Sequence, residues 1–157
     1  MATLHYTPET FNARTAIGYL LRRVLNLWQP RMEALFADQE FTFVQWAVMM
    51  QVRDGVANRA SDISRNLNHD SGALTRVIAQ LESRGLIERT RSTQDRRIVE
   101  LAVTPQGRRL VDASVQLVVD DVNRLLGDFD REEVEMLVGM LNRIIVRLQG
   151  EAGKDGP

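Results

Sequence analysis

Residues 70–104 predict one short helix that runs directly into a β-hairpin. Asp70 is a strong helix N-cap. Gly85-Leu86 is typical of a helix C-terminus, where a glycine in the left-handed conformation is followed by an apolar residue that packs back on the helix. Between these two signals, four apolar residues recur at helical spacing: Leu74, Val77, Ile78 and Leu81. The runs IERTR and IVELAV follow as two β-like segments around the polar stretch STQDRR, which predicts a hairpin with a charged tip.

Two more short helices are predicted just before this segment. Thr42 is the expected N-cap of a helix that Gly55 ends, and residues 60–67 form the next helix. Three compact helices followed by a hairpin is the arrangement of a winged helix-turn-helix, which we place at residues 42–104.

Long amphipathic helices are predicted on both sides of this module. Residues 10–36 predict one helix that Pro30 kinks or restarts, and residues 105–149 predict two helices separated by GDFD. We expect residues 150–157 to be a disordered tail and residues 1–157 to form a single unit. The fold class is mainly α with a small β-hairpin wing. Because the long helices carry more apolar surface than the module can cover, we expect them to be the dimerisation helices of a homodimer.

The composition excludes several kinds of chemistry. The absence of cysteine excludes disulfides and thiolate sites, and His5 and His69 are too few for a histidine-rich metal cluster. We find no nucleophile–base–acid set, no phosphate-binding glycine loop and no metal-ligand spacing, so we expect neither an enzyme nor a cofactor or metal. The sequence shows no signal peptide and no membrane-spanning run, which predicts a soluble cytoplasmic protein without membrane contacts.

Charge is distributed unevenly along the chain. The net charge is −1, but the segment from Arg59 to Arg109 holds ten arginines against six acidic residues, and the rest of the chain is net acidic. A middle segment rich in arginine favours a local surface for nucleic acid. Solvated surface charge is the alternative interpretation, and charge alone does not decide between the two.

The polar face of the helix at residues 71–84 is suited to contact with DNA. It carries Gly72, Thr75 and Arg76, with Ser71 at its start. Arginine can donate to guanine or phosphate, threonine can meet a phosphate or a thymine methyl, and glycine lets the helix N-terminus come close. An ordinary solvent-exposed face is the alternative for this helix taken by itself.

The predicted hairpin tip strengthens the case for DNA. Asp95-Arg96-Arg97 places two arginines on a projecting turn, where the core does not need them. An arginine there can enter the minor groove, and Asp95 can hold an arginine in position by a charge-assisted pair. Arg89 and Arg91 can add phosphate contacts. A solvated tip with a local ion pair is the alternative.

These residues resemble the motif of the MarR family of bacterial transcriptional regulators. The matching positions are Asp70, Leu74-Thr75-Arg76, Leu81-Glu82, Arg84-Gly85-Leu86-Ile87, Arg89, Asp95-Arg96-Arg97, Val103-Thr104 and Gly107. Val103 replaces the usual leucine, and His69 stands where an apolar residue is more typical. Order and spacing both agree with the family pattern, and by architecture the resemblance covers residues 10–149.

The resemblance implies a homodimer on a pseudo-palindromic site in double-stranded DNA. Each subunit presents a recognition helix to the major groove and a wing to the minor groove. By position, Arg97 is the minor-groove arginine and Asp95 its organiser, while Thr75 and Arg76 are recognition-helix contacts. Two serines at the short third helix are further candidates for phosphate contacts: Ser61 and Ser64.

Eight of the nine aromatic residues lie within the first 46 residues. Tyr19, Arg22 and Arg23 share one face of the first long helix, and Trp46 belongs to the same aromatic-rich region. An aromatic side chain beside arginine suits a ring that carries a carboxylate, and many members of the resembled family bind phenolic or aromatic acids. We therefore predict a pocket for a small aromatic carboxylate between the dimer helices and the winged module. Core or dimer packing of these aromatics is the alternative.

Taken together, these patterns predict a dimeric, sequence-specific DNA-binding transcriptional regulator, and more finely a repressor that a small aromatic or phenolic acid releases. The alternative is a winged-helix module for protein interaction or DNA architecture without a specific operator. Arg76 and Arg97 favour the first interpretation, because a protein-interaction module does not require them.

Overall fold

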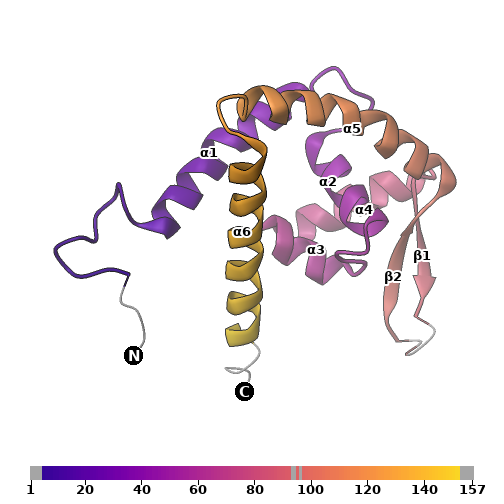
Figure 1. The fold of residues 1–157 in the computed structure, drawn as a ribbon. Coiled ribbons are helices and arrows are strands. Elements are labelled where there is room, and N and C mark those ends of the chain that lie inside the picture. Colours follow the sequence, from indigo (N-terminus) through magenta and orange to yellow (C-terminus); the bar gives the residue numbers. More distant parts are fainter. Residues whose placement is uncertain (1–4, 93–94, 96, 153–157) are drawn as a thin grey trace. The chain divides into compact units, whose positions relative to one another are not determined.

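The computed structural model describes residues 5–92, 95 and 97–152 (Figure 1). In chain order its elements are α1 (Ile17–Leu35), α2 (Phe43–Arg53), α3 (Ala60–Leu67), α4 (Ser71–Ser83), β1 (Ile87–Arg91), β2 (Val99–Val103), α5 (Pro105–Leu125) and α6 (Arg131–Ala152). The two strands form one antiparallel hairpin. The predicted fold class, mainly helical with a small β-hairpin wing, is confirmed.

The chain has two compact units, where the sequence predicts a single one. The first comprises residues 1–114 and the second residues 115–157, so the boundary falls inside α5. All the elements of the winged helix-turn-helix lie in the first unit. A helix can belong to two units because its own backbone hydrogen bonds keep it continuous across the boundary.

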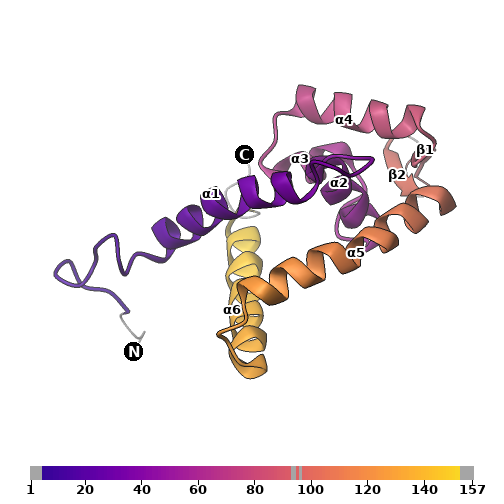
Figure 2. The ribbon, with the colours of Figure 1, turned by 90° about the horizontal axis from the view of Figure 1, so that it is seen from above.

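Helix α4 begins and ends on the signals in its sequence. The Asp70 carboxylate accepts a hydrogen bond from the Ala73 N–H at 2.9 Å. At the other end Gly85 adopts a φ of +68°, and the Leu86 N–H donates to the Leu81 carbonyl at 2.9 Å. This bond closes the helix because it pairs a carbonyl that the last turn would otherwise leave free. Figure 2 shows α4 ending beside the hairpin.

The core of the first unit is built from the helices of the module, the hairpin and the start of α5. Its largest fully buried side chains are Met49, Ile63, Leu74, Ile78, Leu81, Leu86, Ile87, Val48 and Val111. Thr42 and Gln45 form a capping box at the start of α2. The Gln45 amide also donates to the Gln80 side chain of α4 at 3.0 Å, so the cap of α2 helps to align α2 with α4.

The hairpin is attached to the module at its base. In the antiparallel register Ile87 lies opposite Val103, and Ile87 is buried. Leu101 is also buried, and its N–H donates to the Asn58 carbonyl at 2.7 Å. The loop between α2 and α3 therefore acts as a further backbone partner for β2, which fixes the direction in which the hairpin projects.

Helix α1 corrects the predicted helix in two respects. It begins at Ile17 and not at Thr10, because side chains in the preceding segment compete for backbone groups. The Thr15 hydroxyl, for example, donates to the Thr10 carbonyl at 2.8 Å. The helix is also not restarted at Pro30, which lies inside one continuous helix.

In the second unit, Asp130 is the N-cap of α6. The Glu133 N–H donates to the Asp130 carboxylate at 2.8 Å, and the Asp130 N–H donates to the Glu133 carboxylate at 3.0 Å, which makes a capping box. The helix continues to Ala152. Residues 150–152, which the sequence assigns to a disordered tail, are therefore helical, and residues 153–157 lie outside the described residues.

The end of α4, the base of the hairpin and the start of α5 meet at one junction. The Thr104 hydroxyl donates to the Gly85 carbonyl at 2.7 Å and accepts from the Gly107 N–H at 3.1 Å, which caps α5. Gly107 lies directly against the Leu86 carbonyl and the Val103 side chain, so a Cβ at this position would overlap both. The junction therefore requires a residue without a side chain.

Gly107→Ala is expected to lower the free energy of unfolding by about 1–3 kcal/mol, because the added methyl must displace the Leu86 backbone. Urea unfolding followed by far-UV circular dichroism measures the change. Gly18→Ala in α1 is the control, since nothing lies within 4 Å of a Cβ there and alanine favours a helix over glycine. Equal stability of the Gly107→Ala and wild-type proteins would contradict the close approach.

Candidate nucleic-acid interface

Helix α4 presents its predicted DNA-contacting residues on one exposed side. Ser71, Gly72, Thr75 and Arg76 are all exposed, whereas the apolar stripe faces the core. The Thr75 hydroxyl donates to the Ser71 carbonyl at 2.8 Å, which leaves the methyl group and oxygen lone pairs of Thr75 available. A Cβ at Gly72 would come within 3.1 Å of the capping carboxylate of Asp70, so this glycine also protects the N-cap.

The two arginines of β1 differ in what they contact. Arg89 Nε donates to the Glu82 carboxylate at 3.0 Å, which joins the end of α4 to the hairpin. Arg91 is exposed, and within the described residues its side chain forms no such pair. Arg89 therefore positions the wing against α4, whereas Arg91 is the one of the two with a free charge for a phosphate.

At the hairpin tip, Asp95 organises the backbone. Its carboxylate accepts from the Arg97 N–H at 2.9 Å, and its carbonyl accepts from the Ile98 N–H at 2.9 Å. Asp95 thus orders the turn through the main chain, and its pair with an arginine side chain stays a prediction. Arg97 is exposed. Arg96 lies outside the described residues.

The two serines predicted near the phosphate backbone also differ. Ser61 is exposed in the first turn of α3. The Ser64 hydroxyl donates to the His69 carbonyl at 2.7 Å, and Asn68 between them adopts a left-handed φ of 48°. Ser64 therefore holds the turn between α3 and α4, and Ser61 is the better candidate for a phosphate contact.

A charge cluster that the sequence patterns do not reveal joins α2 to α5. Arg53 contacts Asp54 and Asp112, each at 2.7 Å, and its own side chain is only 16% exposed. The hydrogen bonds from Arg53 hold the pKa of Asp54 below its ordinary value, and the bond to Asp54 in turn raises the pKa of Arg53. No spacing rule identifies the pair of Arg53 and Asp112, because they lie 59 residues apart in the chain.

Four aromatic residues from the predicted ligand region form a cluster on the core of the first unit. Neighbouring ring centroids are 5.4 to 6.1 Å apart, and the rings belong to Phe36, Phe41, Phe43 and Trp46. Trp46 is 6% exposed, and its Nε1 is buried without a hydrogen-bond partner in the part of the chain that the structure describes. The structure thus places Trp46 in the core.

A pocket of about 600 Å³ lies between α1, α2 and the turn that leads into α4. Arg22, Trp28 and Phe43 are among the residues that line it. Of the four residues predicted to bind a ligand, Arg22 is the one that the structure brings to this pocket. Tyr19 and Arg23 are exposed on α1 outside it. Trp28 is not among the predicted ligand residues, because a separation of six residues places it on a different face of α1 from Arg22.

Three compact helices, a projecting hairpin, an exposed polar face on α4 and exposed arginines at two places define a winged helix-turn-helix protein. In this class the second helix of the helix-turn-helix enters the major groove of DNA. A family model described as MarR family matches residues 41–99. This match agrees with the resemblance to the MarR family of transcriptional regulators that the motif around α4 and the hairpin predicts.

Individual relatives agree with this assignment. The multiple antibiotic resistance protein MarR of Escherichia coli is 25% identical over 140 residues, which cover 88% of this chain and 97% of that protein. The HTH-type regulator YdgJ of Bacillus subtilis is 34% identical over 84 residues, and the chain spans about half (51%) of its length. Among solved structures, BpsR of Bordetella bronchiseptica is 25% identical with a TM-score of 0.66, over 85% of this chain and 96% of that one.

Proteins of the MarR family are transcriptional regulators and not enzymes, as the sequence predicts. Among the described residues, no helix combines the length and apolarity needed to cross a membrane. The same residues bring together no group of three or more histidine, aspartate or glutamate side chains that could hold a metal ion.

Arg53→Gln is expected to raise the pKa of Asp54 towards its ordinary value. Because the pKa of Asp54 is lowered in the folded protein, its contribution to stability is present above about pH 4 and is lost as the pH falls through the folded pKa. Urea unfolding between neutral pH and acid should show this loss in the wild type and less of it in Arg53→Gln. The difference should stay under about 1 kcal/mol, because Asp54 is 41% exposed.

Arg14→Gln is the control, because it removes one exposed positive charge without touching this cluster. An identical pH dependence of stability in the wild type and Arg53→Gln would show that the pair does not contribute.

Proposed function

We propose that this chain is a dimeric, sequence-specific DNA-binding repressor whose helix α4 enters the major groove while the hairpin reaches the minor groove. The supporting observation is the pairing pattern of the arginines. Arg89 is neutralised by Glu82, whereas the side chains of Arg76 and Arg97 are exposed and unpaired within the described residues. Unpaired guanidinium groups on a helix face and a projecting turn do not serve the core, and DNA supplies the acceptors that match them.

The contacts divide into those that position the protein and those that read sequence. Thr75 and Arg76 lie on the face of α4 that would meet base edges, where bidentate contacts discriminate between bases. Arg91 and Ser61 are placed to meet phosphates, which fix orientation but carry no sequence information. Arg97 would enter the minor groove, where narrow A·T-rich DNA concentrates negative potential.

The proposed dimer rests on the apolar surface of the long helices. On α1 the exposed large apolar residues are Ile17, Leu20, Val24, Leu25 and Leu27. On α6 they are Met136, Leu137, Val138, Met140, Ile145, Val146 and Leu148. Exposed apolar surface of this extent marks a protein interface, and a two-fold dimer is the commonest solution. Such a dimer presents two copies of α4 to half-sites about 34 Å apart.

Alanine variants of the two unpaired arginines test the interface on an operator selected from randomised DNA. Arg97→Ala is expected to weaken binding and to reduce the slope of log affinity against log salt by about 1, because fewer counterions are released. Arg76→Ala is expected to cost about 1–3 kcal/mol and to relax base preference at one position. Fluorescence anisotropy across a salt series measures both effects, and sedimentation of the complex should give two chains per operator.

Arg14→Ala is the matched control, since it removes one exposed charge outside α4 and the hairpin. Unchanged affinity in both test variants would favour the alternative function, a protein-interaction or architectural module. A single chain on each operator would contradict the dimer.

We further propose that the pocket beside Arg22 and Trp28 binds a small aromatic or phenolic carboxylate that weakens DNA binding. Arg22 can pair with the carboxylate, while Trp28 and Phe43 supply aromatic surface for the ring. The DNA binding of BpsR is regulated by 6-hydroxynicotinic acid, which is an aromatic acid. Because residues of the turn before α4 also line the pocket, a bound ring can favour one position of that helix over another.

Titration with hydroxybenzoates and cinnamates tests both halves of this proposal. Binding should change the fluorescence of Trp28 and lower operator affinity by about 5–150-fold, the range of common allosteric couplings. Arg22→Gln should weaken binding, whereas Arg23→Gln, its neighbour outside the pocket, should not. If the two substitutions weaken binding equally, the ligand does not bind in this pocket. If the ligand binds but operator affinity stays unchanged, it does not regulate DNA binding.

A further inference from the structure

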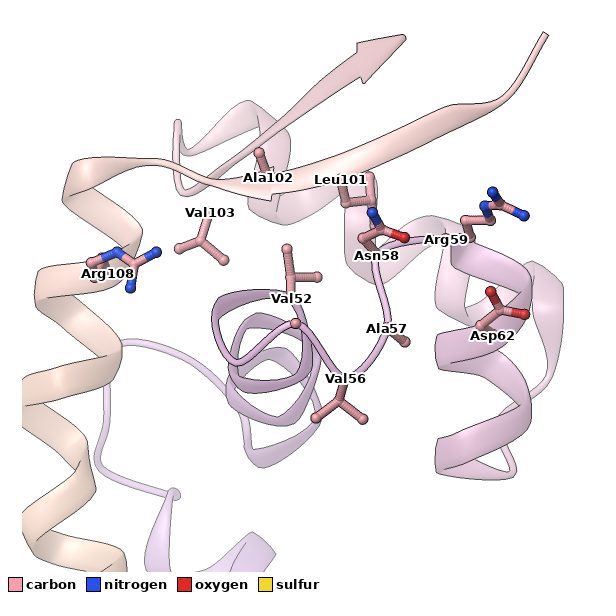
Figure 3. A pocket seen from close by; sticks show the side chains of 11 residues that line it. Val52, Val56, Ala57, Asn58, Arg59, Asp62, Leu101, Ala102, Val103 and Arg108 are labelled. Atoms are coloured by element: carbon pink, nitrogen blue, oxygen red, sulfur yellow. The ribbon is translucent and has the colours of Figure 1, made fainter. Parts of the chain in front are cut away.

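A second pocket, of about 430 Å³, lies beside strand β2, and none of the residues assigned to DNA or to the pocket at Arg22 lines it. The end of α2, the loop to α3, strand β2 and the first turn of α5 line it, and it is open to solvent (Figure 3). Its apolar lining comes from Val52, Val56, Leu101 and Val103, and none of its lining residues is aromatic. It therefore differs in chemistry from the pocket beside Trp28.

The loop between α2 and α3 exposes an apolar side chain, Val56, at this pocket. Val56 is 66% exposed, although the next residue, Ala57, is buried. Gly55 turns the chain with a φ of +68°, and the Val56 N–H donates to the Gln51 carbonyl at 2.9 Å. The exposed valine is thus fixed by the backbone, and the apolar surface of the pocket is preformed.

Arg108 supplies a positive charge that no carboxylate in the described residues pairs with directly. Figure 3 shows its side chain extending from α5 towards Val103. The two carboxylates where α2 meets α5, Asp54 and Asp112, are both bound by Arg53 at 2.7 Å. Arg108 acts on Asp54 only through space. Its guanidinium donors are therefore available to an anion in the pocket.

The opposite end of the pocket carries one positive and one negative side chain. Arg59 and Asp62 both line this end (Figure 3). Asp62 also pairs with Arg65 at 3.4 Å, on the surface of α3. The lining holds two arginines and one aspartate, a net charge of +1, and Arg108 is the arginine at the end away from Asp62 (Figure 3).

We propose that this pocket binds a short aliphatic monocarboxylate, with its carboxylate on Arg108 and its alkyl chain against Val52, Val56 and Leu101. One unbalanced cation matches one carboxylate, and a lining of valine and leucine without aromatic rings favours an alkyl chain over a ring. The volume lies in the range of small-molecule pockets. Leu101 and Val103 belong to β2, so the bound acid contacts the strand that carries the wing.

Hexanoate is the probe, and proton–nitrogen NMR of the full chain without DNA is the readout. Saturable shifts are expected at the backbone amides of Val56, Leu101 and Val103. Arg108→Gln should weaken hexanoate binding about tenfold or more, as expected for the loss of a charged hydrogen bond. Arg109→Gln is the matched control, because Arg109 is the exposed neighbour on α5 that does not line the pocket, and it should leave binding unchanged.

Two further measurements keep the test decisive. Val56→Asp places a negative charge on an already exposed position and should also weaken hexanoate binding, even if Arg108→Gln fails to fold. Hexanol should bind much more weakly than hexanoate. The proposal is overturned if hexanoate shifts none of these amides, if Arg108→Gln and Arg109→Gln bind it equally, or if hexanol binds as well as hexanoate. Because no DNA is present, these outcomes are independent of the proposed repressor function.

Discussion

The close packing of Gly107 against the Leu86 carbonyl sets the geometry of the whole winged unit. At this point the chain leaves α4, turns into β1, returns along β2 and enters α5, and Thr104 bonds both Gly85 and Gly107. A side chain at Gly107 would separate these elements. The direction of the hairpin relative to α4, and with it the proposed spacing of major- and minor-groove contacts, depends on this contact.

Arginine serves two purposes in this unit, and its partners distinguish them. Arg53 and Arg89 each hold two elements together through carboxylates, and they are fixed by those bonds. Arg76, Arg97 and Arg108 have no direct carboxylate partner among the described residues, and each lies where an external anion can reach it. A count of basic residues along the segment does not separate these groups, because pairing depends on which acidic residue folding brings near.

Helix α5 is continuous across the two compact units, and its first turns are tied to the winged unit in several ways. Gly107 packs against the end of α4, Val111 is fully buried, and Asp112 bonds Arg53 of α2. The Arg108 pocket lies beside these contacts, so a ligand there would contact the same region of α5.

Local signals in the sequence are enough to predict the short elements of the winged module. The start of α2 and both ends of α4 depend on side chains or glycines that act on backbone groups within a few residues, namely Thr42, Asp70 and Gly85. Local chemistry therefore predicts these helix ends. Sequence patterns also located the exposed face of α4 and the tip of the hairpin. They misplaced the start of α1 because turn-forming side chains before Ile17 outcompete the helix for backbone hydrogen bonds.

Which candidate residues face solvent, a pocket or the core depends on how the helices pack against one another. In the folded protein Trp46 is buried among other aromatic rings, and Arg89 pairs with Glu82. Arg22 lines a pocket that Tyr19 does not line. The pair of Arg53 and Asp112 and the pocket at Arg108 join segments that lie far apart in the chain. Such contacts depend on how the helices pack against one another. The periodicity of one helix shows which of its faces is apolar, but it does not show which other helix or strand packs on that face.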